Sequence, residues 1–169
     1  LLWLFILMFF YVRVNALELN SKYAVLYNLN EDKVIYELNK DDVVSVASLT
    51  KIMTTLVAVE NIKDYNQEVI LKEEMFFGLK EANAYVINLR VGQKVTYNDL
   101  LYGMFLASGA DATRAVAISV AGSEEKFVEL MNNKAKEIGL KNTHFQNTVG
   151  LDAENHHSTV NEIAILLKS

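Results

Sequence analysis

The segment of residues 48–60 constrains the fold most, because it reads as a helix that is apolar on almost every side. At helical spacing, Ser48, Lys51 and Thr55 share one face. The remaining positions are mostly apolar: Leu49, Ile52, Met53, Leu56, Val57, Ala58 and Val59. Helices of this kind are typical of a protein interior. The sequence therefore predicts a buried helix with one narrow polar stripe, around which the other elements pack.

The polar stripe has the chemistry of an activated nucleophile. A buried amine binds protons less tightly, so Lys51 can act as a base toward a hydroxyl one helical turn away. Ser48 at the N-terminus of the helix gains from the helix dipole once it carries negative charge. The pattern favours Ser48 activated by Lys51, although a capping serine followed by a surface lysine fits the same spacing.

A second Ser-x-x-Lys string, at residues 123–126, shows that the spacing alone is weak. Ser123 follows a glycine and precedes two acidic residues, as the N-cap of a helix does. The polar face of that helix is broad, so Lys126 has no reason to be buried. We predict an N-cap for Ser123 and no chemistry.

The composition narrows the chemistry further. There is no cysteine, which excludes disulfides, thiol catalysis and cysteine-ligated metals. Three histidines without an H-E-x-x-H string make a zinc hydrolase a poor fit. The net charge of −5 and the lack of a basic run argue against a nucleic-acid partner. At 169 residues the chain is one domain or part of one, and we expect no cofactor or metal.

The start of the chain indicates export. Residues 1–12 are apolar throughout, but a bilayer needs about 20 residues to be crossed. An arginine follows, and then Ala16 supplies the small residue of a secretory cleavage site. We therefore expect residues 1–16 to be a partial signal peptide, with an uncleaved membrane anchor as the alternative. Because the initiator methionine and a basic start are missing, the sequence is expected to begin inside this signal.

Two strand-like segments, residues 23–29 and 34–38, flank a short polar loop and predict an antiparallel pair. Residues 69–71 and 85–89 are further strand candidates, and Gly92 marks a turn.

Helix signals follow. Thr96 and Asp99 form a capping box before a helix that should end near residues 108–109. Asp111 can cap a second helix, which Gly122 would stop.

A third helix starts at Ser123, and Gly139 stands where a C′ glycine belongs. A final amphipathic segment covers residues 160–168. Strands followed by several helices indicate an α+β domain.

These residues resemble the serine D-alanyl-D-alanine carboxypeptidases, the low-molecular-mass penicillin-binding proteins, from about Lys22 to the end of the sequence. The matching segments agree in order and spacing: residues 47–54, 99–103, 107–112, 131–135, 139–140, 142–145, 147, 150–152 and 157–159. The resemblance implies a serine β-lactamase/transpeptidase-like α+β fold, with helices packed on an antiparallel sheet and incomplete at its C-terminal end.

The resemblance also implies roles for site residues. Ser48 would attack the carbonyl between two D-alanines of a peptidoglycan stem peptide, and Lys51 would take its proton. Ser108 would relay a proton to the leaving group, and the Ser48 N–H would form half of the oxyanion hole. The implied partners are stem peptides ending in D-Ala-D-Ala and β-lactam antibiotics, in the cell envelope outside the cytoplasm.

Two departures from the family pattern matter. Ala110 stands where the family usually has an asparagine that holds the substrate backbone, with Asp111 and Asn83 as candidates for a nearby polar group. The third motif, Lys-Thr-Gly, occurs nowhere. We expect it beyond residue 169, so residues 17–169 would be a partial catalytic domain with little or no activity. Membrane association through a further C-terminal segment is compatible with the family.

Two alternatives remain open. A class A β-lactamase would need a Glu-x-x-Leu-Asn type of loop, and the nearest string, residues 129–132, lies inside a predicted helix. A non-catalytic penicillin- or wall-binding protein of the same fold would explain Ala110 and the missing third motif. We predict no base among His144, His156 and His157, and a structural role for Asn132.

Overall fold

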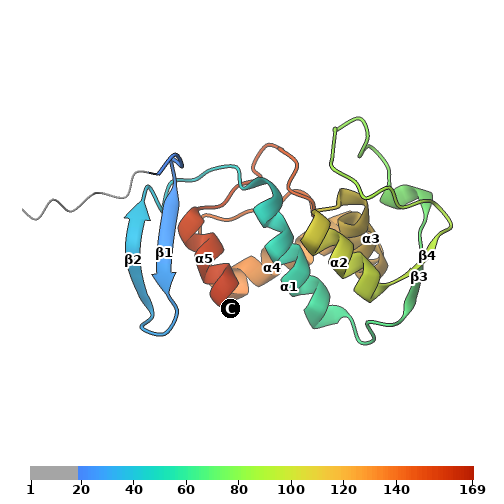
Figure 1. The fold of residues 1–169 in the computed structure, drawn as a ribbon, viewed down its shortest axis with the longest axis horizontal. Coiled ribbons are helices and arrows are strands. Elements are labelled where there is room, and N and C mark those ends of the chain that lie inside the picture. Colours follow the sequence, from blue (N-terminus) through green and yellow to red (C-terminus); the bar gives the residue numbers. More distant parts are fainter. Residues whose placement is uncertain (1–18) are drawn as a thin grey trace, which may run out of the picture.

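The protein is described by a computed structural model that covers residues 19–169. The expected signal peptide, residues 1–16, lies outside the described residues. A strand hairpin lies at one end of the molecule, the helices form its centre, and a second small strand pair lies at the other end (Figure 1). Within residues 19–169, no helix is both long and apolar enough to cross a membrane.

The hairpin consists of β1 (Ala24–Asn28) and β2 (Lys33–Leu38), which pair antiparallel as the sequence predicts. The predicted C-terminal helix is also present as α5 (Val160–Lys168), and it packs beside β1 (Figure 1). The hydroxyl of Thr159 caps α5 by accepting the Glu162 N–H at 3.0 Å. The last helix therefore returns to the first strand.

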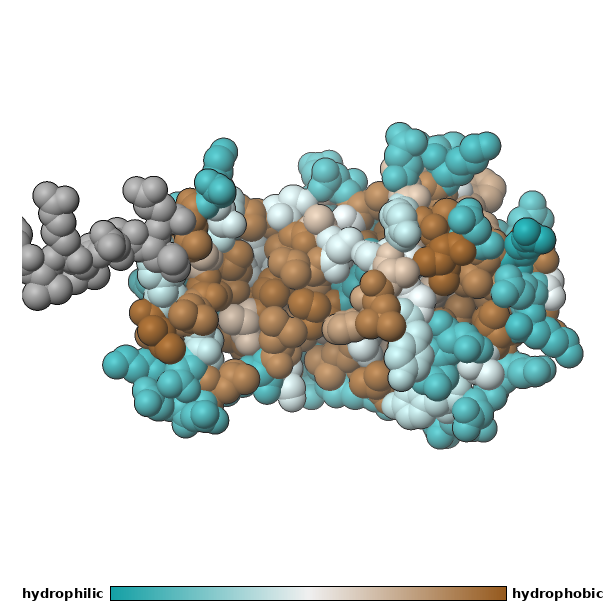
Figure 2. Space-filling view, in the orientation of Figure 1, coloured by the Kyte–Doolittle hydropathy of each residue, from teal (hydrophilic) through white to brown (hydrophobic). Residues whose placement is uncertain are grey.

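The central helix begins later than predicted. A 3₁₀ turn, Ala47–Leu49, precedes α1 (Thr50–Asn61), so Ser48 lies in the turn and not in the helix. The prediction that this helix is covered on all sides was wrong, because Leu49 and Val59 are 44% and 37% exposed. Figure 2 shows apolar side chains gathered across the centre of the molecule, where α1 lies in Figure 1. Periodicity cannot distinguish a helix covered all round from one with an uncovered apolar face.

Three helices follow: α2 (Tyr97–Ala107), α3 (Ala110–Ala121) and α4 (Glu124–Glu137). The predicted caps at Thr96, Ser123 and Gly122 are confirmed. The hydroxyl of Thr96 accepts the Asp99 N–H at 3.1 Å, and that of Ser123 accepts the Lys126 N–H at 3.2 Å. Gly122 ends α3 in the left-handed conformation, with φ +86°. The second Ser-x-x-Lys string is therefore a helix cap.

The predicted capping role of Asp111 was wrong, because Gly109 is the N-cap of α3. The carboxylate of Asp111 is buried and accepts the backbone N–H groups of Ile87 at 3.1 Å and Leu89 at 2.9 Å. The N–H groups of Ile87 and Leu89 therefore bond to a side chain instead of a neighbouring strand, and residues 85–89 form no strand, contrary to the sequence-based expectation.

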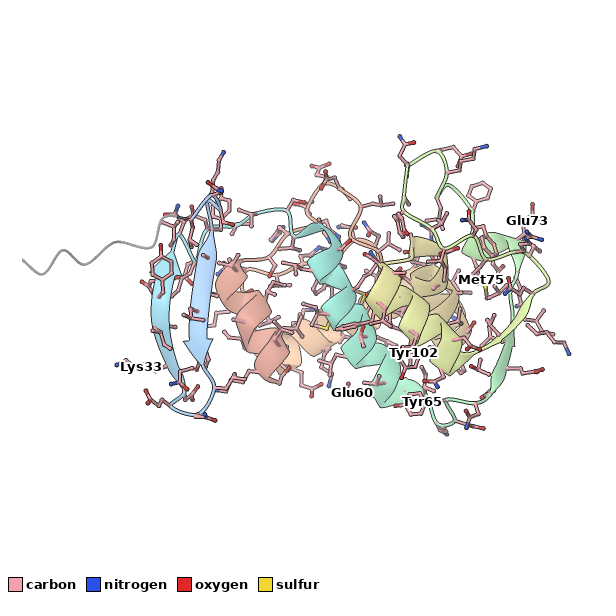
Figure 3. The ribbon with its side chains drawn as sticks, in the orientation of Figure 1. Lys33, Glu60, Tyr65, Glu73, Met75 and Tyr102 are labelled. Carbon is pink, nitrogen blue, oxygen red and sulfur yellow. The ribbon has the colours of Figure 1, made fainter. Side chains whose placement is uncertain are left out.

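The second strand pair joins β3 (Glu68–Ile70) to β4 (Lys94–Thr96). Its first strand was predicted and its partner was not. A 3₁₀ turn, Glu73–Met75, follows β3 and buries Met75 (Figure 3). On α2, Tyr102 is 61% exposed (Figure 3).

The core lies among α1, α2, α3 and α4. Its largest fully buried side chains include Met53, Leu71, Leu100, Met104, Phe127, Met131 and Phe145. The carboxamide of Asn132 ties α4 to the loop beyond it, since it donates to the Phe145 carbonyl and accepts the Phe145 N–H, both at 2.9 Å. The structural role predicted for Asn132 is confirmed. The string considered for a β-lactamase loop, residues 129–132, is helical within α4.

Candidate active site

Two segments that are distant in the sequence, residues 48–51 and the turn at Ser108, meet at Ser48. Ser108, between α2 and α3, donates from its Oγ to Ser48 Oγ at 3.1 Å. Lys51, in the first turn of α1, donates from its Nζ to Ser48 Oγ at 3.2 Å. The structure therefore brings together all three residues that the sequence singled out as catalytic candidates.

Lys51 is the buried amine that the sequence predicts. It is 6% exposed, and its Nζ also donates to the Val149 carbonyl at 2.6 Å. Burial lowers the pKa of Lys51 from the ordinary value of 10.5, because a charged amine is poorly solvated there. A lysine that is neutral over more of the pH range can accept a proton from a hydroxyl beside it.

The backbone is strained at Ser108 and immediately before Ser48. Ala47, immediately before Ser48, has φ +43°, and Ser108 itself has φ +57°. Residues other than glycine adopt this left-handed conformation at a cost of about 1–2 kcal/mol. Such strain persists where the surrounding structure imposes it, and it is frequent at functional sites.

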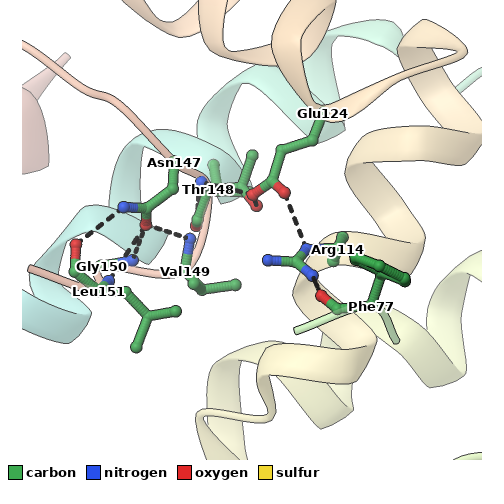
Figure 4. Close-up of polar contacts among 9 residues, drawn as sticks. Phe77, Arg114, Glu124, Asn147, Thr148, Val149, Gly150 and Leu151 are labelled. Carbon is green, nitrogen blue, oxygen red and sulfur yellow. Dashed lines mark hydrogen bonds and ion pairs between the residues drawn. The ribbon is translucent and has the colours of Figure 1, made fainter. Parts of the chain in front are cut away.

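The loop of residues 147–151 holds Lys51 through the Val149 carbonyl. Asn147 organises this loop, since its Oδ1 accepts the N–H groups of Val149, Gly150 and Leu151 at 3.2, 2.8 and 3.1 Å (Figure 4). The hydroxyl of Thr54 on α1 donates to the carbonyl of the loop residue Thr148 at 2.7 Å. The Val149 carbonyl, which binds Lys51, is therefore held in place by the contacts of Asn147 and of Thr54 with this loop.

A half-buried acidic side chain supports the same loop. Glu124 Oε1 accepts the backbone N–H of Thr148 at 3.1 Å and its hydroxyl at 2.7 Å. Glu124 Oε2 pairs with Arg114 Nε at 2.8 Å, and Arg114 also donates to the Phe77 carbonyl (Figure 4). Sequence reasoning missed Glu124, because it counted this residue only among the acids that follow an N-cap.

Gly150 lets this loop pass directly against the turn that carries Ser48. Its φ is +86°, and a Cβ built there would lie 1.9 Å from the Ala47 carbonyl oxygen. No side chain fits at such a separation, so the approach of the two backbones depends on glycine.

A cavity of about 140 Å³ opens at the three side chains, lined also by Asn83 and Ala110. Asn83 thus lies at the site, as considered from the sequence, whereas the Asp111 carboxylate is occupied by Ile87 and Leu89. A second hollow of about 330 Å³ shares Ser48 and has a mostly apolar wall that includes Phe105.

None of the histidines reaches Ser48. His156 is buried, with Nε2 2.8 Å from Thr50 Oγ1, and its Nδ1 accepts the Gln146 N–H at 3.1 Å. Both of its ring nitrogens are therefore occupied. Among residues 19–169 there is no cluster of three or more histidine or acidic side chains that suits a metal ion.

Residues 11–169 match the D-alanyl-D-alanine carboxypeptidase family. The chain belongs to that family. It is 38% identical over 156 residues to the D-alanyl-D-alanine carboxypeptidase DacF of Bacillus subtilis, covering 92% of this chain and 40% of the relative.

Solved structures of the family share the fold. The D-alanyl-D-alanine carboxypeptidase DacD of Francisella tularensis gives a TM-score of 0.83 at 32% identity, over 89% of this chain and 37% of that chain. A DD-transpeptidase from Streptomyces gives 0.83 at 29% identity, over 88% of this chain and 60% of that one. The predicted transpeptidase-like α+β fold is confirmed, and the chain spans about two fifths of the length of the curated relative.

Proposed function

We propose that this chain supplies the nucleophile and base of an exported serine peptidase that removes the terminal D-alanine from peptidoglycan stem peptides. The main observation that supports this proposal is that Lys51 Nζ and Ser108 Oγ both lie within hydrogen-bond distance of Ser48 Oγ, at 3.2 and 3.1 Å. Family membership supports the choice of substrate.

In the acylation step, neutral Lys51 takes the proton of Ser48 Oγ while that oxygen bonds to the carbonyl carbon between the two D-alanines. The carbonyl oxygen becomes negative and accepts the Ser48 N–H, a donor that is worth about 3–4 kcal/mol in other serine hydrolases. The C–N bond then breaks. The departing D-alanine amine receives the proton from Lys51 through Ser108, which leaves an ester on Ser48.

In the deacylation step, water attacks the ester carbonyl and gives a proton to Lys51. Lys51 returns this proton to Ser48 Oγ as the Ser48–carbon bond breaks, and the shortened peptide leaves as a carboxylate after its remaining acid proton passes to solvent. A β-lactam would acylate Ser48 in the same way, because its strained amide takes the place of the peptide bond. Inhibition by β-lactams is therefore part of the proposal.

The remaining parts of the proposal concern the whole protein. Residues 1–16 would direct export to the cell envelope, and residues 17–169 would form part of the catalytic domain. The string Lys-Thr-Gly does not occur in these residues, so the second oxyanion donor and a cation for the substrate carboxylate are assigned to no residue here.

A second candidate function is a non-catalytic penicillin- or wall-binding protein of the same fold. Ala110 favours it, because its methyl group lines the cavity where the family pattern has a carboxamide. The two candidates share a reactive Ser48 toward penicillin and differ in turnover of peptide.

The test uses the full-length gene product with a peptide ending in D-Ala-D-Ala and a matched peptide ending in L-Ala-L-Ala. We expect free D-alanine from the first peptide, no alanine from the second, and covalent labelling by a fluorescent penicillin. Labelling without release of D-alanine would favour the binding protein. Release from both peptides alike would refute the proposed specificity.

The rate of labelling should fall as the pH is lowered through the pKa of Lys51. Burial lowers the pKa of this amine, and the protonated form cannot accept the Ser48 proton. Labelling rates measured across the neutral and alkaline range should rise with one ionisation below the ordinary lysine value of 10.5. A rate that does not depend on pH, or a midpoint at or above that value, would contradict the role of Lys51.

A further inference from the structure

The cavity at Ser48 also contains a polar group to which the sequence motifs assign no role. Its polar side chains come from Ser48, Lys51, Ser108, Tyr85 and Asn83. The first three are bonded to one another, and Lys51 is further engaged by the Val149 carbonyl. Of the residues that line the cavity, only Asn83 carries a carboxamide.

At residue 110 the cavity offers the substrate no polar side chain. Ala110 is 3% exposed and lines the cavity, and its side chain is a methyl group. Its backbone N–H is already used, since it donates to the Tyr85 carbonyl at 2.8 Å. A peptide bound here would meet no hydrogen-bonding side chain at residue 110.

Asn83 is held at the cavity by its own loop. Its N–H donates to the Lys80 carbonyl at 3.0 Å, and the next N–H, of Ala84, donates to the Leu79 carbonyl at 2.9 Å. The backbone of Asn83 is left-handed, with φ +50°, a conformation that asparagine tolerates better than most residues. Two residues later the Tyr85–Ala110 bond fastens the loop to the start of α3.

The carboxamide of Asn83 forms no hydrogen bond within residues 19–169, and it is accessible to solvent. A carboxamide offers a donor and an acceptor together, which matches the C=O and N–H of a peptide backbone. We propose that Asn83 binds the backbone amide of the stem peptide beside the scissile bond, in place of a polar side chain at residue 110. This inference rests on the proposed function and names a residue that binds the substrate backbone.

The test compares variants of the full-length gene product. Asn83→Gly removes the carboxamide without disturbing the left-handed backbone, since glycine adopts positive φ freely. We expect kcat/KM for the D-Ala-D-Ala peptide to fall about tenfold, as for the loss of one hydrogen bond. Asn83→Asp keeps the size and the backbone preference but cannot donate, and it should lose at least as much. Adding Ala110→Asn to Asn83→Gly should restore part of the loss.

Asn88→Gly is the matched control, because Asn88 lies in the same segment with φ +63° and does not line this cavity. Its kcat/KM should equal that of the unaltered protein. Full activity of Asn83→Gly, or an equal loss in Asn88→Gly, would overturn the inference. If the unaltered protein labels with penicillin but releases no D-alanine, the proposed function fails separately. The same tenfold comparison is then made on the labelling rate.

Discussion

Replacing Ser48 by alanine is expected to abolish covalent labelling by a fluorescent penicillin and release of D-alanine by the full-length gene product. The variant lacks the hydroxyl that both Lys51 and Ser108 contact, and within residues 19–169 no other hydroxyl contacts both. Loss of a nucleophile in serine hydrolases lowers turnover by about 10⁶-fold. Because Ser48 is exposed and lies in a 3₁₀ turn, the variant should fold normally.

Ser123→Ala is the matched control, since Ser123 begins the other Ser-x-x-Lys string. It should lower stability by about 1 kcal/mol through the loss of an N-cap, and it should leave labelling intact. Labelling of Ser48→Ala at the normal rate would refute the role given to Ser48.

Replacing Gly150 by alanine is expected to impair the site through its backbone. The added Cβ would lie 1.9 Å from the Ala47 carbonyl oxygen, so the loop or the turn before Ser48 must move. Displacements of about 1 Å at a reacting centre can lower rates by about 10²-fold. We expect a loss of that order in the labelling rate, together with a lower melting temperature.

Gly122→Ala separates this contact from simple backbone strain. Gly122 has the same φ of +86°, but a Cβ built there meets nothing within 4 Å. It should destabilise the protein by about 1–2 kcal/mol and leave the labelling rate of the folded protein unchanged. Equal labelling rates in the two alanine variants would show that the approach of Gly150 to Ala47 has no part in the reaction.

The sequence correctly predicted those contacts that join residues close together in the chain. The caps at Thr96 and Ser123 and the pairing of Ser48 with Lys51 all join residues three apart. Such contacts follow from helix geometry, and they were found without any knowledge of the tertiary structure.

What the sequence did not predict depends on distant partners. Asp111 binds backbone groups 22 and 24 positions earlier, and Glu124 binds Thr148, 24 positions later. Both are acidic residues near a helix start, where a local cap is the simplest interpretation. No residue near them in the sequence indicates the distant loop that each one binds. The role of Ser108 came from family resemblance, since nothing local distinguishes it from the end of a helix.

The hydrogen bonds that define the site also bear on how the protein folds. Ser108 lies 60 positions from Ser48, and Val149 lies 98 positions from Lys51. Closing such long loops requires most of the domain to be ordered first, whereas capped helices such as α2 and α4 can form from short segments. A partly folded chain can therefore show nearly native helix content while its Lys51 still lacks the Val149 carbonyl. Acylation of Ser48 thus reports on completed folding in a way that helix content does not.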